Sequence, residues 1–336
     1  MKESNSNNHK KIIYGVFILS FFLAMISGRF GIQLKDYTQF FPNLLYFLKT
    51  GEPINPAFTI LFSVRLPRII LAMAIGAGLS VAGLIFQQIF KNPIASPDIL
   101  GVSSGASFGA ALAMVIAINI PASVQVLSFI FGLMAVFITY SLKKVSRNEN
   151  ILYLVLSGLI VSAFFSALLS FIKYIADPYQ QLPSIVFWTM GGLYKANWTN
   201  AILCFFMVVI LGFVFQKLSY KIGILSIDDD LAKTMGINIG KFRNGILTLA
   251  ALMVSLCVSV AGTIGWIALI CPHISRLIFR NDKKLTIYTG LIGASSLMLL
   301  DTLARSLTTS ELPVGILTAL VGAPALGYFI MVKKTL

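Results

Sequence analysis

Residues 65–106 read RLPRIILAMAIGAGLSVAGLIFQQIFKNPIASPDILGVSSGA. No charged side chain lies between Arg68 and Lys91, so this stretch holds the roughly 20 apolar residues that a helix needs to cross a bilayer. Two prolines, Pro93 and Pro97, follow the apolar run and forbid a regular helix through the turn. The stretch therefore predicts a membrane-spanning helix, an irregular turn and a second helix that begins near residue 98.

Similar apolar runs recur along the whole 336-residue chain. The chain is 57% hydrophobic and 11% charged, whereas an ordinary soluble domain carries roughly 25% charged residues. So few charges cannot cover the surface of a soluble protein of this size, but a bilayer accepts an apolar exterior. The runs predict ten membrane-spanning helices, at 12–30, 65–89, 98–118, 122–142, 150–172, 197–216, 243–262, 264–280, 285–304 and 313–332.

The predicted fold is therefore an all-α, polytopic membrane protein with about ten transmembrane helices in one domain. Residues 12–332 form that domain, between cytoplasmic tails at 1–11 and 333–336. With both termini inside, 18 of the 26 Lys and Arg residues fall on inner segments, as the positive-inside rule requires. The net charge of +14 is thus explained by topology, and we expect no nucleic acid partner.

Charged residues gather near the outer ends of two predicted helices. Arg65 and Arg68 are three residues apart and share a helix face. They are either interfacial anchors or a cationic landing point for carboxylates of an external partner. Asp301 and Arg305 are four apart and can form an ion pair, which serves either structure or docking.

The largest inner loop, 217–242, carries the pattern of a short helix. Ser226 is a candidate N-cap with Asp229 completing a capping box, and Gly236 suits the position just after the helix. Ile227, Leu231 and Met235 repeat every four residues and form an apolar edge. Such a helix either caps the bundle or docks in a groove on a cytoplasmic partner.

Several chemical functions find no support in the sequence. The segment from Gly236 to Lys241 is one residue too short for a phosphate-binding loop and lacks its Ser or Thr. Cys271-Pro272-His273 is interpreted as a proline-kinked helix end, and we expect no metal site, cofactor or catalytic residue in this chain. Asp301 is the only acidic residue within a predicted helix core, which disfavours an ion-coupled secondary transporter.

Six segments, taken together and in order, resemble the FecCD-type family of ABC importer permeases for iron–siderophore complexes, haem and cobalamin. The segments are Arg65–Arg68, Asn92–Ala106, Asp229–Gly236, Gly262–Arg276, Asp301–Arg305 and Glu311–Gly315 with Gly322–Pro324. The resemblance implies the type II importer architecture, in the bacterial cytoplasmic membrane. It also leaves a permease for molybdate or another oxyanion as the alternative, with an ion-coupled secondary transporter less favoured.

The resemblance further implies partners and site residues. The permease would pair with a second copy or a paralogue, two cytoplasmic ATPases that bind ATP and Mg²⁺, and an extracytoplasmic binding protein. By position, Arg65, Arg68 and Arg305 would receive the binding protein. The coupling element in the ATPase would comprise Asp229, Asp230, Leu231, Ala232, Met235 and Gly236. The translocation path would include Trp188, Met190, Gly191, Gly192, Pro313 and Gly315, and would be lined by the fifth and tenth helices.

Overall fold

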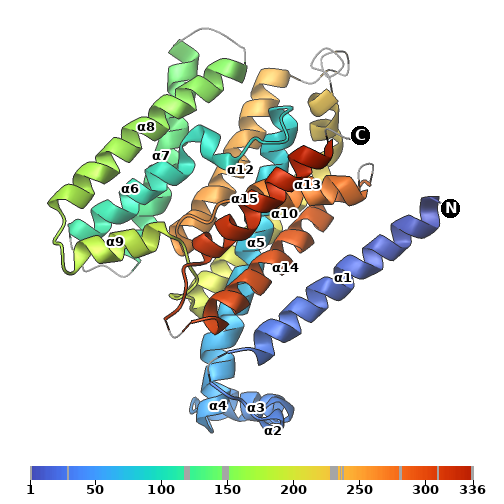
Figure 1. The fold of residues 1–336 in the computed structure, drawn as a ribbon, viewed down its shortest axis with the longest axis vertical. Helices are drawn as coiled ribbons and strands as arrows, with labels where there is room; N and C mark the ends of the chain where they lie inside the picture. The colour runs from blue at the N-terminus through green and yellow to red at the C-terminus, as the bar shows by residue number, and fades with distance from the viewer. Residues whose placement is uncertain are drawn as a thin grey trace.

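The computed structural model describes residues 2–28, 30–116, 122–145, 151–227, 234, 236, 238–279, 282–308 and 310–333. These residues form helices joined by short connections, with no β-strand among them (Figure 1). The helices are α1 (Lys2–Ile26), α2 (Leu34–Thr38), α3 (Phe40–Thr50), α4 (Pro56–Thr59), η1 (Ile60–Arg65), α5 (Leu66–Ile89), η2 (Pro97–Leu100), α6 (Val102–Val115), α7 (Ser123–Val145), α8 (Ile151–Ile175), α9 (Gln181–Thr189), α10 (Trp198–Ile227), α12 (Ile239–Ala261), α13 (Ile267–Phe279), α14 (Leu285–Ser306) and α15 (Val314–Lys333).

Seven stretches of the described chain are helical, long and apolar enough to cross a bilayer. They lie at Asn8–Ile26, Pro56–Ile89, Ser123–Val145, Ile151–Ile175, Trp198–Ser226, Ile239–Ala261 and Leu285–Ser306. Three shorter apolar helices, α6, α13 and the first part of α15, occupy the remaining three predicted spans. The all-α polytopic fold predicted from the sequence is confirmed.

α6 and α13 are too short to span a membrane as helices alone. With 14 and 13 residues they are each roughly 20 Å long, whereas the hydrocarbon core measures about 30 Å. Irregular backbone next to such a helix is tolerated at membrane depth only where it is buried in protein. Residues 96–98 before α6 and 264–266 before α13 line a pocket that is described below.

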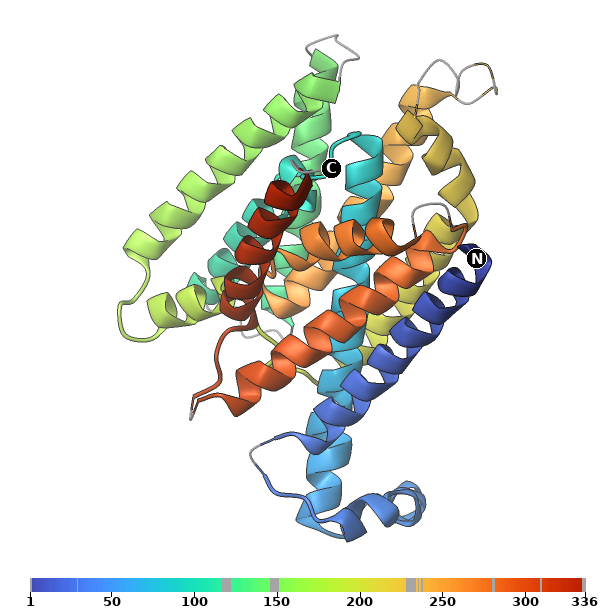
Figure 2. The ribbon, with the colours of Figure 1, turned by 45° about the vertical axis from the view of Figure 1, so that its right-hand side comes forward.

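α5 lies at the centre of the bundle in both views (Figures 1 and 2). It packs against α14, α10, α13 and α12. Two glycines allow its closest approaches: a β-carbon at Gly76 would overlap the carbonyl oxygen of Gly293, and one at Gly83 would overlap that of Ala268. Small residues at such crossings let helix backbones touch, which is the main source of packing energy between helices in lipid.

The helix that contains α5 begins nine residues earlier than predicted. Asn55 caps it, its side-chain oxygen accepting a hydrogen bond from the Phe58 N–H at 2.7 Å, and Pro56 takes the first helical position. Pro67 therefore lies inside a continuous helix. Since proline removes one backbone donor and crowds the preceding turn, the helix widens into the π-helical segment η1 directly before it.

α6, α7, α8 and α9 form a second group of helices beside α5 and α12 (Figures 1 and 2). Phe108, Phe131 and Phe165 pack at their centre. The glycine stripe of α6 faces α7: a β-carbon at Gly105 would lie 2.5 Å from the Phe131 carbonyl oxygen, and Gly109 meets the Leu127 carbonyl in the same way. Gly105 and Gly109 thus form a packing surface that lets α6 approach α7 closely.

Two helix ends differ from the sequence prediction. α10 continues to Ile227, and Ser226 lies in its last turn with its hydroxyl donating to the Gly223 carbonyl at 2.6 Å, so the prediction that Ser226 caps a new helix is wrong. Ile222 and Leu225 are buried there and keep α10 packed. At the other end of the chain, α1 begins at Lys2 and includes the residues predicted as a tail.

Substituting Gly105 by valine should lower the stability of the bundle. The new side chain would press α6 away from the Phe131 backbone, and overpacking of this kind costs about 1–3 kcal/mol. Thermal unfolding in detergent measures the effect. Gly245→Val in α12 is the matched control, because a β-carbon there meets nothing within 4 Å. Equal unfolding temperatures for the two variants would contradict the packing role of Gly105.

Candidate functional site

Arg68, near the N-terminus of α5, is held between two carboxylates. Its Nε and Nη2 donate to Asp301 of α14 at 2.8–3.1 Å, and its Nη1 donates to both carboxylate oxygens of Glu311 at 2.9 and 3.1 Å. The side chains of Arg68 and Asp301 are 7% and 2% exposed, and that of Glu311 is 34% exposed. Arginine suits such a site because its planar fork donates to two carboxylates at once.

Asp301 also pairs with Arg305 one turn further along α14, with 3.3 Å between Oδ2 and Nε. The sequence prediction of this i, i+4 pair is confirmed. Arg305 is itself buried, and its Nη2 donates to the carbonyl oxygen of Ala24 in α1 at 3.2 Å. Asp301 is therefore shared by two arginines, and α1, α5 and α14 meet at this point.

Arg65 caps the end of α1. Its Nη1 donates to the carbonyl oxygens of Met25 and Ile26 at 2.6 and 3.0 Å, and its Nη2 donates to Phe30 O at 2.7 Å. The last carbonyls of a helix have no partner within the helix and carry partial negative charge, so a guanidinium there satisfies both needs. Arg65, Arg68, Asp301, Arg305 and Glu311 together form what we call the arginine cluster.

Three members of the arginine cluster are the residues predicted to receive the binding protein. Arg65, Arg68 and Arg305 are 3%, 6% and 7% exposed, and each donates hydrogen bonds within the chain. In this structure they connect α1, α5, α14 and the segment before α15. The partly exposed Glu311 is the member of the cluster that a partner could reach first.

Three connections between helices meet at a second site, which we call the glycine junction. They are residues 188–192 at the end of α9, residues 262–266 between α12 and α13, and residues 313–315 at the start of α15. Gly191 and Gly262 have φ of 72° and 70°, which favours glycine. A β-carbon at Gly262 would overlap the Trp188 carbonyl, and one at Gly315 would overlap that of Met190.

Backbone hydrogen bonds hold the glycine junction together. The Gly192 N–H donates to Ala261 O at 2.8 Å, and the Gly315 N–H donates to Gly191 O at 3.4 Å. The Thr263 hydroxyl donates to the Thr189 carbonyl. The junction brings together all six residues predicted for the translocation path: Trp188, Met190, Gly191, Gly192, Pro313 and Gly315. Trp188 is buried, whereas the side chain of Met190 is 39% exposed.

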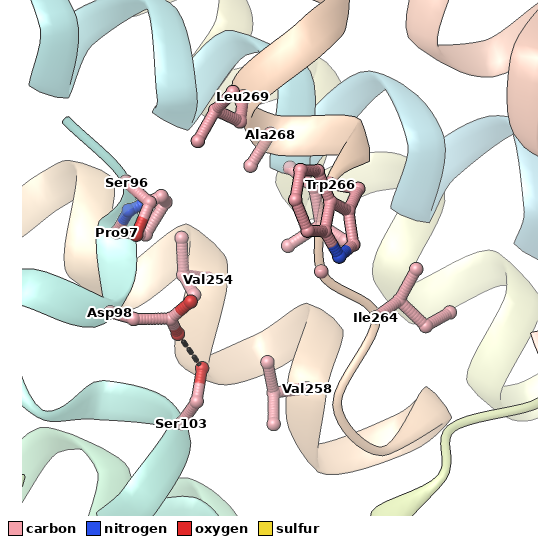
Figure 3. Close-up of a pocket in the computed structure, with 12 residues that line it drawn as sticks. Ser96, Pro97, Asp98, Ser103, Val254, Val258, Ile264, Trp266, Ala268 and Leu269 are labelled. Atoms are coloured by element: carbon pink, nitrogen blue, oxygen red, sulfur yellow. Dashed lines mark hydrogen bonds between the residues drawn. The ribbon is translucent and has the colours of Figure 1, made fainter. Parts of the chain in front are cut away.

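A pocket of about 190 Å³ opens beside the junction, between η2, α12 and the start of α13. Figure 3 shows Asp98 and Ser103 on one side and Trp266 across the opening. The Ser103 hydroxyl donates to Asp98, and Trp266 has a φ of 63°, which a non-glycine residue rarely adopts. Sequence reasoning did not select these three residues; the only signal was an acidic residue within the double-proline turn.

The segment predicted as the coupling element is the least described part of the chain among the predicted sites. Asp229, Asp230, Leu231, Ala232 and Met235 lie outside the described residues. Gly236 is described, and its φ of 73° agrees with the left-handed conformation predicted for it.

Comparison with known proteins decides the family. The model of the FecCD transport family matches residues 16–332. The chain belongs to the FecCD transport family. Members are transport permeases, so the chain is an ABC importer permease and a multi-pass membrane component, as its fold indicates.

Relatives of this FecCD chain carry different substrates in their names. The molybdate import system permease of Haemophilus influenzae is 37% identical over 98% of this chain and 97% of its own length. A probable iron chelatin permease of Helicobacter pylori is 35% identical over 93% and 95%. A solved structure of a metal-chelate type ABC transporter, in an inward-facing conformation, superposes with a TM-score of 0.83 at 34% identity, covering 96% of this chain and 99% of that one.

Replacing Asp301 by asparagine should destabilise the chain by about 3–5 kcal/mol, because the change leaves Arg68 and Arg305 as buried cations without a shared carboxylate. Glu311→Gln removes a carboxylate that is one-third exposed, so its effect should be clearly smaller. Unfolding of both variants in detergent, followed by circular dichroism, gives the comparison. Equal losses of stability in the two variants would mean that the burial of a carboxylate does not determine how much it stabilises the arginine cluster.

Proposed function

We propose that this chain is the permease subunit of an importer that moves a metal chelate, such as an iron–siderophore complex, haem or cobalamin, across the bacterial cytoplasmic membrane. The observation that carries the proposal is the apolar exposed face of α8 and α15, the two helices that the family resemblance assigns to the path. α15 exposes Leu320, Val321 and Tyr328, and α8 exposes Leu159, Ile160 and Phe164. An organic chelate can pass along such a surface with little loss of hydration.

The charges of these two helices support the same class of cargo. α8 carries one basic residue, Lys173, in its last turn, and α15 carries none before Lys333. A path for a small oxyanion would gain from cations or aligned N–H donors along it, since a bare anion is costly to desolvate. In a metal chelate, the organic ligand surrounds the metal ion, so the cost of desolvating a bare ion does not arise.

Molybdate remains the second candidate. It is favoured by the Haemophilus influenzae permease, which matches nearly the whole chain at 37% identity. Asp98, the acidic group in the pocket beside the junction, argues against a free anion there, because like charges repel.

The proposed mechanism is alternating access driven by separate ATPases. Two permease copies, or this chain and a paralogue, would enclose the path along α8, α9 and α15, with the glycine junction at its side. Residues 229–236 would seat in the ATPase and transmit closure of its ATP- and Mg²⁺-bound dimer. The permease makes no chemical bond and supplies a two-state element that its partners bias.

An extracytoplasmic binding protein would act at the arginine cluster. Glu311 occupies one edge of Arg68 and is partly exposed. A carboxylate of the docked binding protein would compete with Glu311 for that edge. Because Glu311 precedes α15 by three residues, its release would loosen the segment that positions α15 along the path.

Transport in proteoliposomes tests the cargo. The permease is reconstituted with its cognate ATPase and binding protein, and ATP-dependent uptake of ⁵⁵Fe-chelates and of ⁹⁹Mo-molybdate is measured separately. We expect uptake of an iron chelate that excess unlabelled molybdate does not reduce. Uptake of molybdate alone would replace the first proposal by the second, and uptake driven by an ion gradient without ATP would refute both.

Docking is tested by Glu311→Gln. Freeing one edge of Arg68 should tighten binding of the binding protein about two- to fivefold, the value of an exposed ion pair. Surface plasmon resonance on the permease complex measures this. Glu52→Gln, on the connection before α4, is the control and should leave affinity unchanged. Weaker binding by Glu311→Gln would instead make Glu311 itself a contact.

A further inference from the structure

A groove of about 390 Å³ lies between α1 and α10, with α5 and α14 as its floor. The groove is open because Ala77 of α5 and Gly290 of α14 are small. Phe17 of α1 and Phe213 of α10 lie at its edges. The lining is apolar except for Gln216 and Thr286, which lie at one end. We call this the α1–α10 groove; it is on the side of α5 away from α6–α9 (Figures 1 and 2).

The dimensions of the α1–α10 groove match one lipid chain. Along α10 it runs from Phe205 to Gln216, about 16 Å, which is close to the thickness of one leaflet of hydrocarbon.

The polar end of the groove is basic. Gln216 donates to the Lys283 carbonyl at 2.7 Å and so places the start of α14 against α10. Lys283 and Lys284 are exposed there, and the ammonium of Lys217 lies 5.3 Å from the ring centre of Phe213 at the groove edge. The nearby acid, Asp282, is paired with Lys10 at 2.9 Å.

We propose that the α1–α10 groove binds one anionic phospholipid, with an acyl chain between α1 and α10 and its phosphate at Lys217, Lys283 and Lys284. The apolar lining accepts the chain, and the basic end is where a headgroup lies when the chain spans one leaflet. Each lysine near a membrane surface favours an anionic lipid by about fivefold. The site is separate from the glycine junction and does not depend on the cargo.

Native mass spectrometry of the purified full chain tests the site. The protein is titrated with phosphatidylglycerol and with phosphatidylcholine of identical acyl chains. We expect one phosphatidylglycerol to bind at least fivefold more tightly than phosphatidylcholine, which is the contribution of a single lysine. Replacing Lys217, Lys283 and Lys284 together by glutamine should abolish that preference, with a smaller loss for phosphatidylcholine than for phosphatidylglycerol.

A variant that fills the groove separates this site from ordinary lipid contact. Gly212 lines the groove and a β-carbon there meets nothing within 4 Å, so the ring of Gly212→Phe should occupy the groove and weaken binding of both lipids about tenfold. Gly15→Phe is the control: it also has open space, lies on α1 outside the groove, and should bind both lipids normally.

Three results would overturn the proposal. The first is equal binding of the two lipids by the unaltered chain. The second is unchanged lipid binding by Gly212→Phe. The third is a dimer of the unaltered chain that Gly212→Phe dissociates, because this would assign the groove to a second copy of the chain. Thermal unfolding without added lipid shows whether Gly212→Phe is folded. If it is not, the lysine variant alone decides, because its three positions are exposed.

Discussion

The hydrocarbon of a bilayer offers no hydrogen bonds, so every backbone N–H and C=O at membrane depth must find its partner within the protein. Regular helices meet this constraint by themselves. The connections of the glycine junction likewise supply partners to one another: Gly192 donates to Ala261, and Gly315 donates to Gly191. Interrupted helices can exist here because each interruption supplies the hydrogen-bonding partners of another.

The same constraint explains the placement of the buried charges. A guanidinium in a low-dielectric setting is stable only where acceptors surround it. Arg65 is surrounded by carbonyls at the end of α1, and Arg68 by two carboxylates. These acceptors belong to different elements. The buried arginines therefore connect four segments of the bundle, although a charged side chain without such acceptors would be unfavourable there.

Hydropathy, a local property, predicted the ten helices because each span is readable from its own residues. Contacts between distant residues could not be predicted in this way. Arg68 is separated from Asp301 by 233 positions and from Glu311 by 243, so its local pattern suggested an outward-facing cation. Ser226 and Asp229 carry a capping signal, but burial of Ile222 and Leu225 extends α10 past it. Family resemblance grouped Gly191 with Gly315, although the carbonyl contacts that require glycine are visible only in three dimensions.

The length of α10 has a mechanical consequence. At 30 residues it is about 45 Å long, so part of it extends beyond a hydrocarbon core of about 30 Å. It packs against α5 and α12, and residues 228–236 follow it directly in the sequence. Ile222 and Leu225 are buried, so the last turns of α10 stay attached to the bundle. A displacement of that end is therefore passed to α5, the helix about which the bundle is built and against which α10 packs.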